Sequence, residues 1–322
     1  MTHRIRPVAL ALAAFLPLVA CHKADKPEAV KLDYATYNPV GLLLKEKGFL
    51  EESLAKDGIR VEWTKSLGSN KSLEFLNSKS VDFGSTAGAA ALIAKSNGNP
   101  IRSIYVYSKP EWTALVTTAG SGVQKIADLK GKKVAVTRGT DPFVFLLRSL
   151  DSVGLSDKDV EIVPLQHPDG KTALERGDVA AWSGLDPLMA TTEVEKGSKL
   201  FFRSPDWNTY GVLNVREEFA RSYPAIVDRV LAAYEQARAY ALAHPDELKA
   251  ALAKEAHLTD PVAQVVLGRT DISSGAIGEK QASAILAAGD VLKKSGIVKA
   301  DVDVGAVVKA LVDSSFSARL AR

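Results

Sequence analysis

The sequence contains one cysteine in 322 residues. That residue, Cys21, has no second cysteine with which to form an internal disulfide, so the fold must depend on its packed core. Charge of one sign is also lacking, because 41 Lys and Arg residues accompany 38 Asp and Glu residues for a formal net charge of +3. Nucleic-acid binding requires a basic stripe, so we expect no nucleic-acid partner.

The common catalytic and metal-binding motifs are missing as well. The sequence has no Gly-x-Ser-x-Gly, no Walker box and no His-Glu-x-x-His. The Ser-x-x-Lys pattern at residues 53–56 has no partner boxes, and we take it as a coincidence. His167, His244 and His257 show no metal-ligand spacing, and we expect each of them on the surface or in a loop. The sequence therefore favours a protein that is not an enzyme and that uses no cofactor and no metal.

Only one apolar run has the character of a targeting segment. Residues 8–20 are apolar and follow a basic start, which is typical of a signal peptide, and the run is too short for a membrane-spanning helix. It ends in Leu-Val-Ala-Cys21, which resembles the bacterial lipoprotein signature, although an ordinary cleavage site near Cys21 is the alternative. We expect residues 1–20 to be a lipoprotein signal peptide and residues 21–28 to be a flexible tether. The protein would then be periplasmic and attached to a membrane only through its lipid.

The rest of the chain alternates strand-like and helix-like segments. Residues 81–94 run from a short strand through a turn of small residues into an alanine-rich helix, and residues 134–142 and 180–187 repeat this order. Helices are predicted at 40–56, 71–78 and 170–176, and nearly throughout from residue 223 onward. This alternation predicts an α/β protein whose mostly parallel sheet is covered by helices on both faces. We expect two lobes joined by two crossings, with residues 29–117 and 215–322 in lobe I and residues 118–214 in lobe II.

The junctions between strands and helices predict a site for a small anion. The first N–H groups of a helix lack intrahelical partners, and the helix dipole adds partial positive charge there. A phosphate, sulfate, sulfonate or carboxylate is therefore bound well at such an end. Ligands of open α/β sheets bind beyond the carboxyl ends of the strands. Several junctions together indicate a cleft for an anion, although a single junction is common in α/β proteins that bind nothing.

Three stretches carry a family resemblance. Residues 82–86 (Asp-Phe-Gly-Ser-Thr), residues 126–136 (Ile-Ala-Asp-Leu-Lys-Gly-Lys-Lys-Val-Ala-Val), and Val-Ala-Ala-Trp182 with Asp186-Pro187 resemble the solute-binding subunits of ABC importers for aliphatic sulfonates. The wider group includes binders of taurine, nitrate and pyrimidine precursors. The resemblance implies a type II periplasmic binding protein, with two α/β lobes, a two-strand hinge and a cleft between the lobes. It also implies an alkanesulfonate or similar small organic anion as ligand, ABC permease and ATPase subunits as partners, and a monomer.

The resemblance also places the ligand-binding residues at the turns that follow the strands. In chain order these would be Asn38, Ser69, Asn70, Ser85, Thr86, Ala87, Gly88, Arg138, Gly139, Thr140, Asp141, Trp182 and Asp186. Sulfonate has three oxygens that share one charge. Backbone N–H groups, helped by the hydroxyls of Thr86 and Thr140, would hold these oxygens without a lysine.

Several of these residues allow two interpretations. Asp141 and Asp186 each precede a proline, so each is either a helix cap or a carboxylate that receives a ligand ammonium, as taurine would offer. Arg138 is either a clamp for an oxyanion or a partner of Asp141. Trp182 either forms a wall for the ligand's tail or belongs to the core. Residues 206–208 are a candidate hinge loop.

Two other functions are compatible with the sequence. The same fold could bind taurine, nitrate or a pyrimidine precursor. It could also be an enzyme similar to the pyrimidine synthases that resemble these binders, but such an active site is rich in His and Cys, and the single cysteine lies at the amino end.

Overall fold

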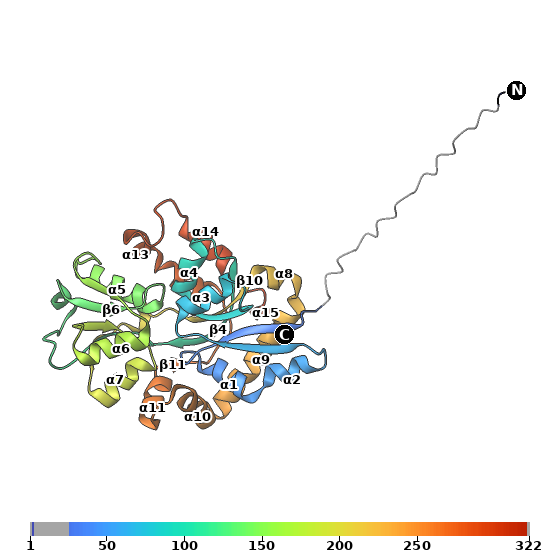
Figure 1. Ribbon diagram of the computed structural model, residues 1–322, viewed down its shortest axis with the longest axis horizontal. Helices are drawn as coiled ribbons and strands as arrows, with labels where there is room; N and C mark the ends of the chain where they lie inside the picture. Colours follow the sequence, from blue (N-terminus) through green and yellow to red (C-terminus); the bar gives the residue numbers. More distant parts are fainter. Residues whose placement is uncertain (1, 3–25, 321–322) are drawn as a thin grey trace.

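The computed structural model describes residue 2 and residues 26–320. Cys21, the signal-peptide prediction and most of the predicted tether lie outside the described residues. Within residues 26–320 the strands form two separate sheets, which Figure 1 shows side by side, with β6 in one and β1, β4 and β10 in the other. No helix in this part of the chain is long and apolar enough to cross a membrane.

The first sheet has the strand order β11-β4-β10-β3-β1-β2. Strands β1, β2 and β3 are parallel, whereas β10 runs antiparallel to both β3 and β4, and β11 runs antiparallel to β4. All three parallel strands therefore end at the same edge of the sheet. The strands are β1 (Ala29–Tyr34), β2 (Arg60–Lys65), β3 (Phe83–Ala87), β4 (Ile101–Pro110), β10 (Gly211–Arg216) and β11 (Thr270–Asp271).

The second sheet has the strand order β7-β6-β8-β5-β9. Strands β6, β7 and β8 are parallel, and β5 is antiparallel to its neighbours β8 and β9. The strands are β5 (Leu115–Thr117), β6 (Lys133–Val136), β7 (Glu161–Pro164), β8 (Ala181–Ser183) and β9 (Lys199–Phe202).

The chain passes between the sheets twice, at residues 111–114 and 203–210. Strand β5 therefore belongs to the second sheet and β10 to the first, so both crossings lie several residues before the boundaries expected at 117/118 and 214/215. The two crossings are joined directly, because Asn208 Oδ1 accepts a hydrogen bond from Thr113 N at 2.8 Å. The candidate hinge loop at 206–208 lies in the second crossing, where Trp207 packs against Phe145 and Phe202.

Helices cover both sheets. The second sheet carries α5 (Asp141–Asp151), α6 (His167–Arg176) and α7 (Leu188–Lys196), and a short 3-10 turn at Ile126–Leu129. The other helices come from the parts of the sequence that precede and follow the second sheet. They are α1 (Pro39–Lys47), α2 (Phe49–Ala55), α3 (Ser69–Asn77), α4 (Gly88–Ser96), α8 (Glu217–Ser222), α9 (Pro224–Ala243), α10 (Pro245–Ala256), α11 (Asp260–Gly268), α12 (Glu279–Leu286), α13 (Gly289–Lys294), α14 (Val304–Leu311) and α15 (Ser317–Leu320).

Some elements differ from the sequence prediction. The single helix predicted at 40–56 is divided into α1 and α2, because Gly48 adopts φ 69°, a left-handed conformation that ends a helix. The short elements β11 and α8 were not predicted. Helix α6 begins at His167, three residues earlier than predicted, which places this histidine in the first turn of a helix instead of in a loop.

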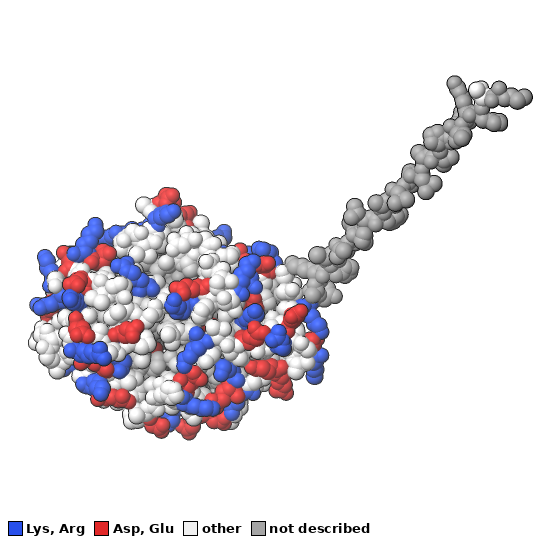
Figure 2. Space-filling model, viewed as in Figure 1, with Lys and Arg blue, Asp and Glu red and all other residues white. Residues whose placement is uncertain are grey.

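The surface carries interspersed charges. On the face drawn in Figure 2, Lys and Arg residues alternate with Asp and Glu residues, and no broad area of one sign covers that face. Any selective recognition by groups on this face must therefore depend on individual side chains and backbone groups.

Candidate functional site

The N-terminus of α4, which the sequence places at the centre of the anion site, already has partners within the protein. Gly88 N donates to Tyr210 O at 2.9 Å, and Ala89 N donates to Thr209 Oγ1 at 3.1 Å. Just before the helix, Ala87 N donates to Ser69 Oγ at 2.9 Å. Three donors at this turn are therefore used to attach the second crossing and α3 to β3.

Asp141 lies at the start of α5 and holds both crossings. Its Oδ2 accepts from Trp112 Nε1 in the first crossing and from Thr209 N in the second, both at 2.9 Å. Its Oδ1 accepts from Thr209 Oγ1 at 2.8 Å. Burial raises the pKa of this carboxyl, and the hydrogen bonds from Trp112 and Thr209 oppose that rise. The carboxylate of Asp141 thus lies between the starts of α4 and α5.

Arg138 is not the partner of Asp141 in this structure. No ion pair joins these two residues, both of which belong to the described part of the chain. The exposed guanidinium group of Arg138 lies over the ring of Phe143, 5.1 Å from its centroid. Of the two alternatives for Arg138, contact with an oxyanion therefore stays a prediction.

The predicted hydroxyl ligands are also bound internally. Thr86 Oγ1 accepts from Asn214 Nδ2 at 2.7 Å, and Thr140 Oγ1 donates to Thr137 O at 2.6 Å. Ser85 Oγ accepts from Asn38 Nδ2 at 2.9 Å. These groups hold the carboxyl ends of the strands in place, so in this structure they are engaged within the protein.

A buried carboxylate lies beneath this edge of the first sheet. Asp33 Oδ1 accepts from Ser85 N and Asp33 Oδ2 accepts from Ser66 Oγ, both at 2.7 Å. Burial raises the pKa of Asp33 to about 6, although these hydrogen bonds lower it. Tyr37 OH donates to Ser85 O at 3.0 Å. The network fixes the ends of β1, β2 and β3 relative to one another.

The starts of α3, α5 and α6 differ from the start of α4. Within residues 26–320, the backbone N–H groups of Ser69, Asn70 and His167 have no hydrogen-bond partner, and neither do those of Gly139 and Thr140. The first N–H groups of a helix point away from it along its axis, and the dipole makes this end attractive to an anion. Two of the predicted turns, at the starts of α3 and α5, therefore present unused donors, and so does the start of α6, which was not predicted as part of the site.

These three turns come together from both sheets. A β-carbon at Gly68, just before α3, would lie 2.8 Å from Asn70 Oδ1 and 3.1 Å from His167 Nε2 of α6. A β-carbon at Gly139, before α5, would lie 3.6 Å from Asn70 Cβ. The start of α3 on the first sheet therefore meets the starts of α5 and α6 on the second.

Several buried side-chain atoms at this meeting point lack partners within the described residues. They are Asn70 Oδ1 and both ring nitrogens of His167, and Trp182 Nε1, beneath α6, also lacks a partner. His167 is 1% exposed and Trp182 is fully buried. A β-carbon at Gly170 would lie 2.7 Å from Trp182 Nε1, and Gly170 is on the same face of α6 as His167, three residues earlier. Asn70 and His167 thus form one cluster, whereas the indole of Trp182 packs beneath α6 in the core of the second sheet, with Ala173 and Met189.

The prediction that His167 is a surface or loop residue is wrong. Burial lowers the pKa of its imidazole to about 3, so the ring is neutral near pH 7 and has one N–H donor and one acceptor nitrogen. The absence of metal-ligand spacing gave no information about burial, which depends on the contact between α6 and the Gly68 turn. His244 and His257 are exposed, as predicted.

Asp186, which follows β8 of the second sheet, contacts the end of α11, a helix from the part of the chain that forms the first sheet. Its Oδ1 accepts from Ala190 N in α7 at 2.9 Å, and its Oδ2 lies 3.7 Å from Arg269, which follows α11 and also pairs with Glu193 of α7. Burial raises the pKa of Asp186 to about 7, and the Arg269 charge lowers it. The side chain therefore acts as a helix cap and an interhelix contact.

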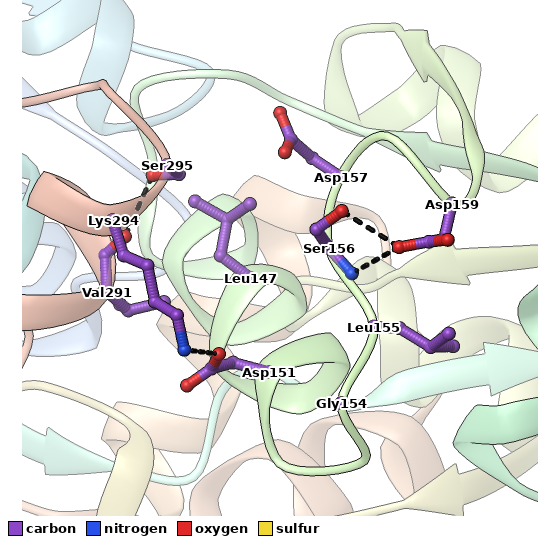
Figure 3. A pocket seen from close by; sticks show the side chains of 10 residues that line it. All are labelled: Leu147, Asp151, Gly154, Leu155, Ser156, Asp157, Asp159, Val291, Lys294 and Ser295. Atoms are coloured by element: carbon purple, nitrogen blue, oxygen red, sulfur yellow. Dashed lines mark hydrogen bonds and ion pairs between the residues drawn. The ribbon is translucent and has the colours of Figure 1, made fainter.

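A second contact between the two parts of the chain joins α5 to α13. A hollow with a volume of about 290 Å³ lies between the end of α5, the loop at 154–159 and α13. Figure 3 shows the side chains that line it. Lys294 reaches across it and forms an ion pair with Asp151. This ion pair is a second contact between the two parts of the chain, besides that of Asp186 with Arg269.

The residues assigned by the family resemblance now divide into two groups. Ser69, Asn70, Gly139 and Thr140 lie at the meeting of the three turns, whereas Trp182 lies in the core of the second sheet. The others are engaged within the protein. Arg138 is stacked on the ring of Phe143, and Ala87 and Gly88 lie at the α4 turn. The side chains in internal hydrogen bonds are Asn38, Ser85, Thr86, Asp141 and Asp186.

Known proteins resemble the chain along most of its length. A protein of Bacillus subtilis (strain 168) and one of Escherichia coli (strain K12), both provisionally named aliphatic sulfonates-binding protein, are each 28% identical to it. The first match covers 85% of this chain and 82% of the relative, and the second covers 79% and 81%.

Solved structures show the same architecture. The periplasmic aliphatic sulphonate binding protein of Escherichia coli matches with a TM-score of 0.74 and 25% identity, over 87% of this chain and 96% of that one. The alkanesulfonate-binding protein of Xanthomonas axonopodis pv. citri, solved with MOPS bound, gives a TM-score of 0.81 at 22% identity, over 89% and 99%. The predicted α/β periplasmic binding protein fold is confirmed.

A family model described as "NMT1/THI5 like" matches residues 41–248, which is more than half of the chain. The chain therefore belongs to the NMT1/THI5-like family.

Proposed function

We propose that the chain is the solute-binding subunit of an ABC importer, which binds an aliphatic sulfonate between its two sheets and delivers it to the permease and its ATPase. The observation that carries this proposal is the meeting of the α3, α5 and α6 starts, whose unused N–H groups come from both sheets. The sulfonate-binding names of the relatives at 25–28% identity support the same ligand class.

The chemistry of this meeting point suits a monoanion with several oxygens. Backbone donors at Ser69, Asn70 and Gly139 would approach the anion from different directions. A sulfonate spreads one charge over three oxygens, so it can use several neutral donors without a lysine. A ligand bound by both sheets stabilises the closed arrangement by its extra affinity for that state.

The alternative is the same fold with taurine, nitrate or a pyrimidine precursor as ligand. A taurine-binding periplasmic protein of Escherichia coli (strain K12) is 28% identical over 214 residues, which supports this group of ligands. Taurine would need an acceptor for its ammonium group. The carboxylates of Asp141 and Asp186, which were the candidates for that role, already accept hydrogen bonds from the protein.

A thermal-shift series tests the ligand class. Alkanesulfonates of increasing length, taurine and nitrate are each added at about a hundredfold excess over the dissociation constant, which stabilises a binder by about 2.7 kcal/mol. We expect alkanesulfonates to raise the melting temperature by several degrees. If they have no effect while taurine or nitrate does, the sulfonate assignment is wrong. Recovery of the ligand unchanged separates a binding protein from an enzyme.

We also propose a periplasmic location with lipid on Cys21, and a division into residues 29–110 with 211–320 on the first sheet and 115–202 on the second. The lipoprotein-like end of the apolar run supports the first point, and the strand order supports the second. Labelling of expressing cells with palmitate should mark the wild-type protein and not Cys21→Ser. Equal labelling of both would contradict the lipid assignment.

A further inference from the structure

The proposed site contains acceptors as well as donors. Asn70 Oδ1 is buried and has no partner within residues 26–320, and the neutral ring of His167 offers one acceptor nitrogen. Both groups lie at the Gly68 turn, where a β-carbon would be 2.8 Å from Asn70 Oδ1 and 3.1 Å from His167 Nε2. The oxygens of an anion cannot satisfy an acceptor. A ligand that consists only of an anionic group and an alkyl tail would leave both acceptors, Asn70 Oδ1 and the acceptor nitrogen of His167, unpaired.

We propose that His167 and Asn70 select an anionic guest that also carries an uncharged hydrogen-bond donor, such as a hydroxyl group, a few bonds from its anionic end. This inference rests on the proposed function and specifies the ligand class within it. The sulfonate oxygens would take the backbone donors, while the hydroxyl, which has one hydrogen, would donate to Asn70 Oδ1 or to the acceptor nitrogen of His167. When it donates to Asn70, its oxygen can also accept from the imidazole N–H.

The charged groups around the cluster argue for an uncharged donor rather than an ammonium. Asp141 is bound by Trp112 and Thr209, and Asp186 is bound by Ala190 and lies beside Arg269.

Near the cluster, two pairs of charged side chains form within α3 and within α6, and Asp169 in the first turn of α6 is exposed to water. Lys71 lies 2.7 Å from Glu74 on α3, and Lys171 lies 2.8 Å from Glu175 on α6. An ammonium would therefore lose its water without gaining a free carboxylate, which is unfavourable in a buried site.

The spacing limits where the donor sits on the guest. The acceptors of Asn70 and His167 meet at the same turn whose N–H groups at Ser69 and Asn70 would hold the anion. A hydroxyl two carbons from the sulfonate sulfur fits this short separation, whereas a hydroxyl at the end of a long chain does not. Ethanesulfonate and 2-hydroxyethanesulfonate are therefore a matched pair of probes.

Isothermal titration calorimetry with these two probes tests the proposal. We expect the wild-type protein to bind 2-hydroxyethanesulfonate about tenfold or more tighter than ethanesulfonate, because a site with buried unpaired groups discriminates against the analogue that cannot satisfy them. In His167→Phe, which keeps a ring of similar size without nitrogens, the ratio should fall to about twofold or less. The control His244→Phe changes an exposed histidine and should keep the wild-type ratio.

The possible outcomes separate this inference from the function beneath it. If the wild-type protein binds both probes equally, or if His167→Phe retains the full preference, the selection by His167 is refuted while sulfonate binding stands. If the wild-type protein binds neither probe and no other alkanesulfonate, the proposed function fails as well. Should His167→Phe not fold, Asn70→Leu tests the second acceptor, and a preference that Asn70→Leu leaves unchanged refutes the proposal.

Discussion

Replacing Asp186 by asparagine isolates the energetic effect of a buried carboxylate. The side chain is 4% exposed, and burial raises its pKa from the ordinary value of 3.8 to about 7. The folded state therefore holds the proton more tightly than the unfolded state does. The resulting stability is fully present below pH 3.8 and is lost as the pH rises through about 7.

The size of this effect follows from the two pKa values. Between pH 5 and pH 8 the wild-type protein should lose about 2.5 kcal/mol of unfolding free energy through Asp186 alone, since one pKa unit corresponds to about 1.4 kcal/mol. Asparagine keeps an oxygen that can accept from Ala190 N but does not titrate. The variant should therefore gain about 2.5 kcal/mol relative to the wild type over this pH range.

Urea unfolding followed by circular dichroism at pH 5, 6, 7 and 8 measures the difference. Asp246→Asn is the matched control, because that side chain is 99% exposed and its replacement removes a surface carboxylate instead of a buried one. A difference between Asp186→Asn and the wild type that stays constant to within about 0.5 kcal/mol would refute the reasoning, because it would mean that burial does not favour the protonated carboxyl.

Three further substitutions test other contacts. Gly68→Ala places a β-carbon 2.8 Å from Asn70 Oδ1, so we expect about tenfold weaker sulfonate binding by calorimetry, and unchanged affinity would contradict the meeting of the three turns. Asp141→Ala leaves the donors of both crossings unpaired and should lower the urea-unfolding free energy by about 3 kcal/mol; a loss below about 1 kcal/mol would show that the crossings are held otherwise. Lys294→Ala breaks an exposed ion pair with Asp151 and should lower the urea-unfolding free energy by less than about 1 kcal/mol. A larger loss would contradict the view that this contact between α5 and α13 is weak.

The strands and helices could be predicted from the sequence because they depend on residues that are neighbours in the chain. The short apolar strand ending at Ala87 and the alanine-rich helix after it follow directly from residues 81–94, and the structure places β3 and α4 there. The turn chemistry at Gly68–Asn70 and at Gly139 was also visible, because small and polar residues mark the start of a helix. These turns are the part of the predicted site that meets at one place.

The use made of each turn could not be predicted in this way. The donors at the start of α4 are taken by Thr209 and Tyr210, which lie about 120 residues later in the sequence and approach only because β10 pairs with β3. The hydroxyl of Thr86 is taken by Asn214 for the same reason. A strand-to-helix motif reports that donors exist, whereas tertiary pairing decides whether they remain available.

His167 was missed because its role depends on a neighbour rather than on spacing. The residue precedes a proline at the start of α6, a position that a sequence pattern also allows for a loop. Its burial comes from contact with the Gly68 turn of the other sheet. The missing side chain of Gly68 is the signal that two segments approach closely there, but the sequence does not name the second segment.

The hydrogen bond from Trp112 to Asp141 has a practical consequence. Of the four tryptophans in the sequence, Trp112 and Trp207 lie in the two crossings and Trp182 lies in the core of the second sheet. Indole emission shifts with the polarity around the ring, so Trp112 and Trp207 form a built-in optical reporter of the crossings. Any movement of one sheet relative to the other should be measurable in the unlabelled protein, in real time and without an added dye.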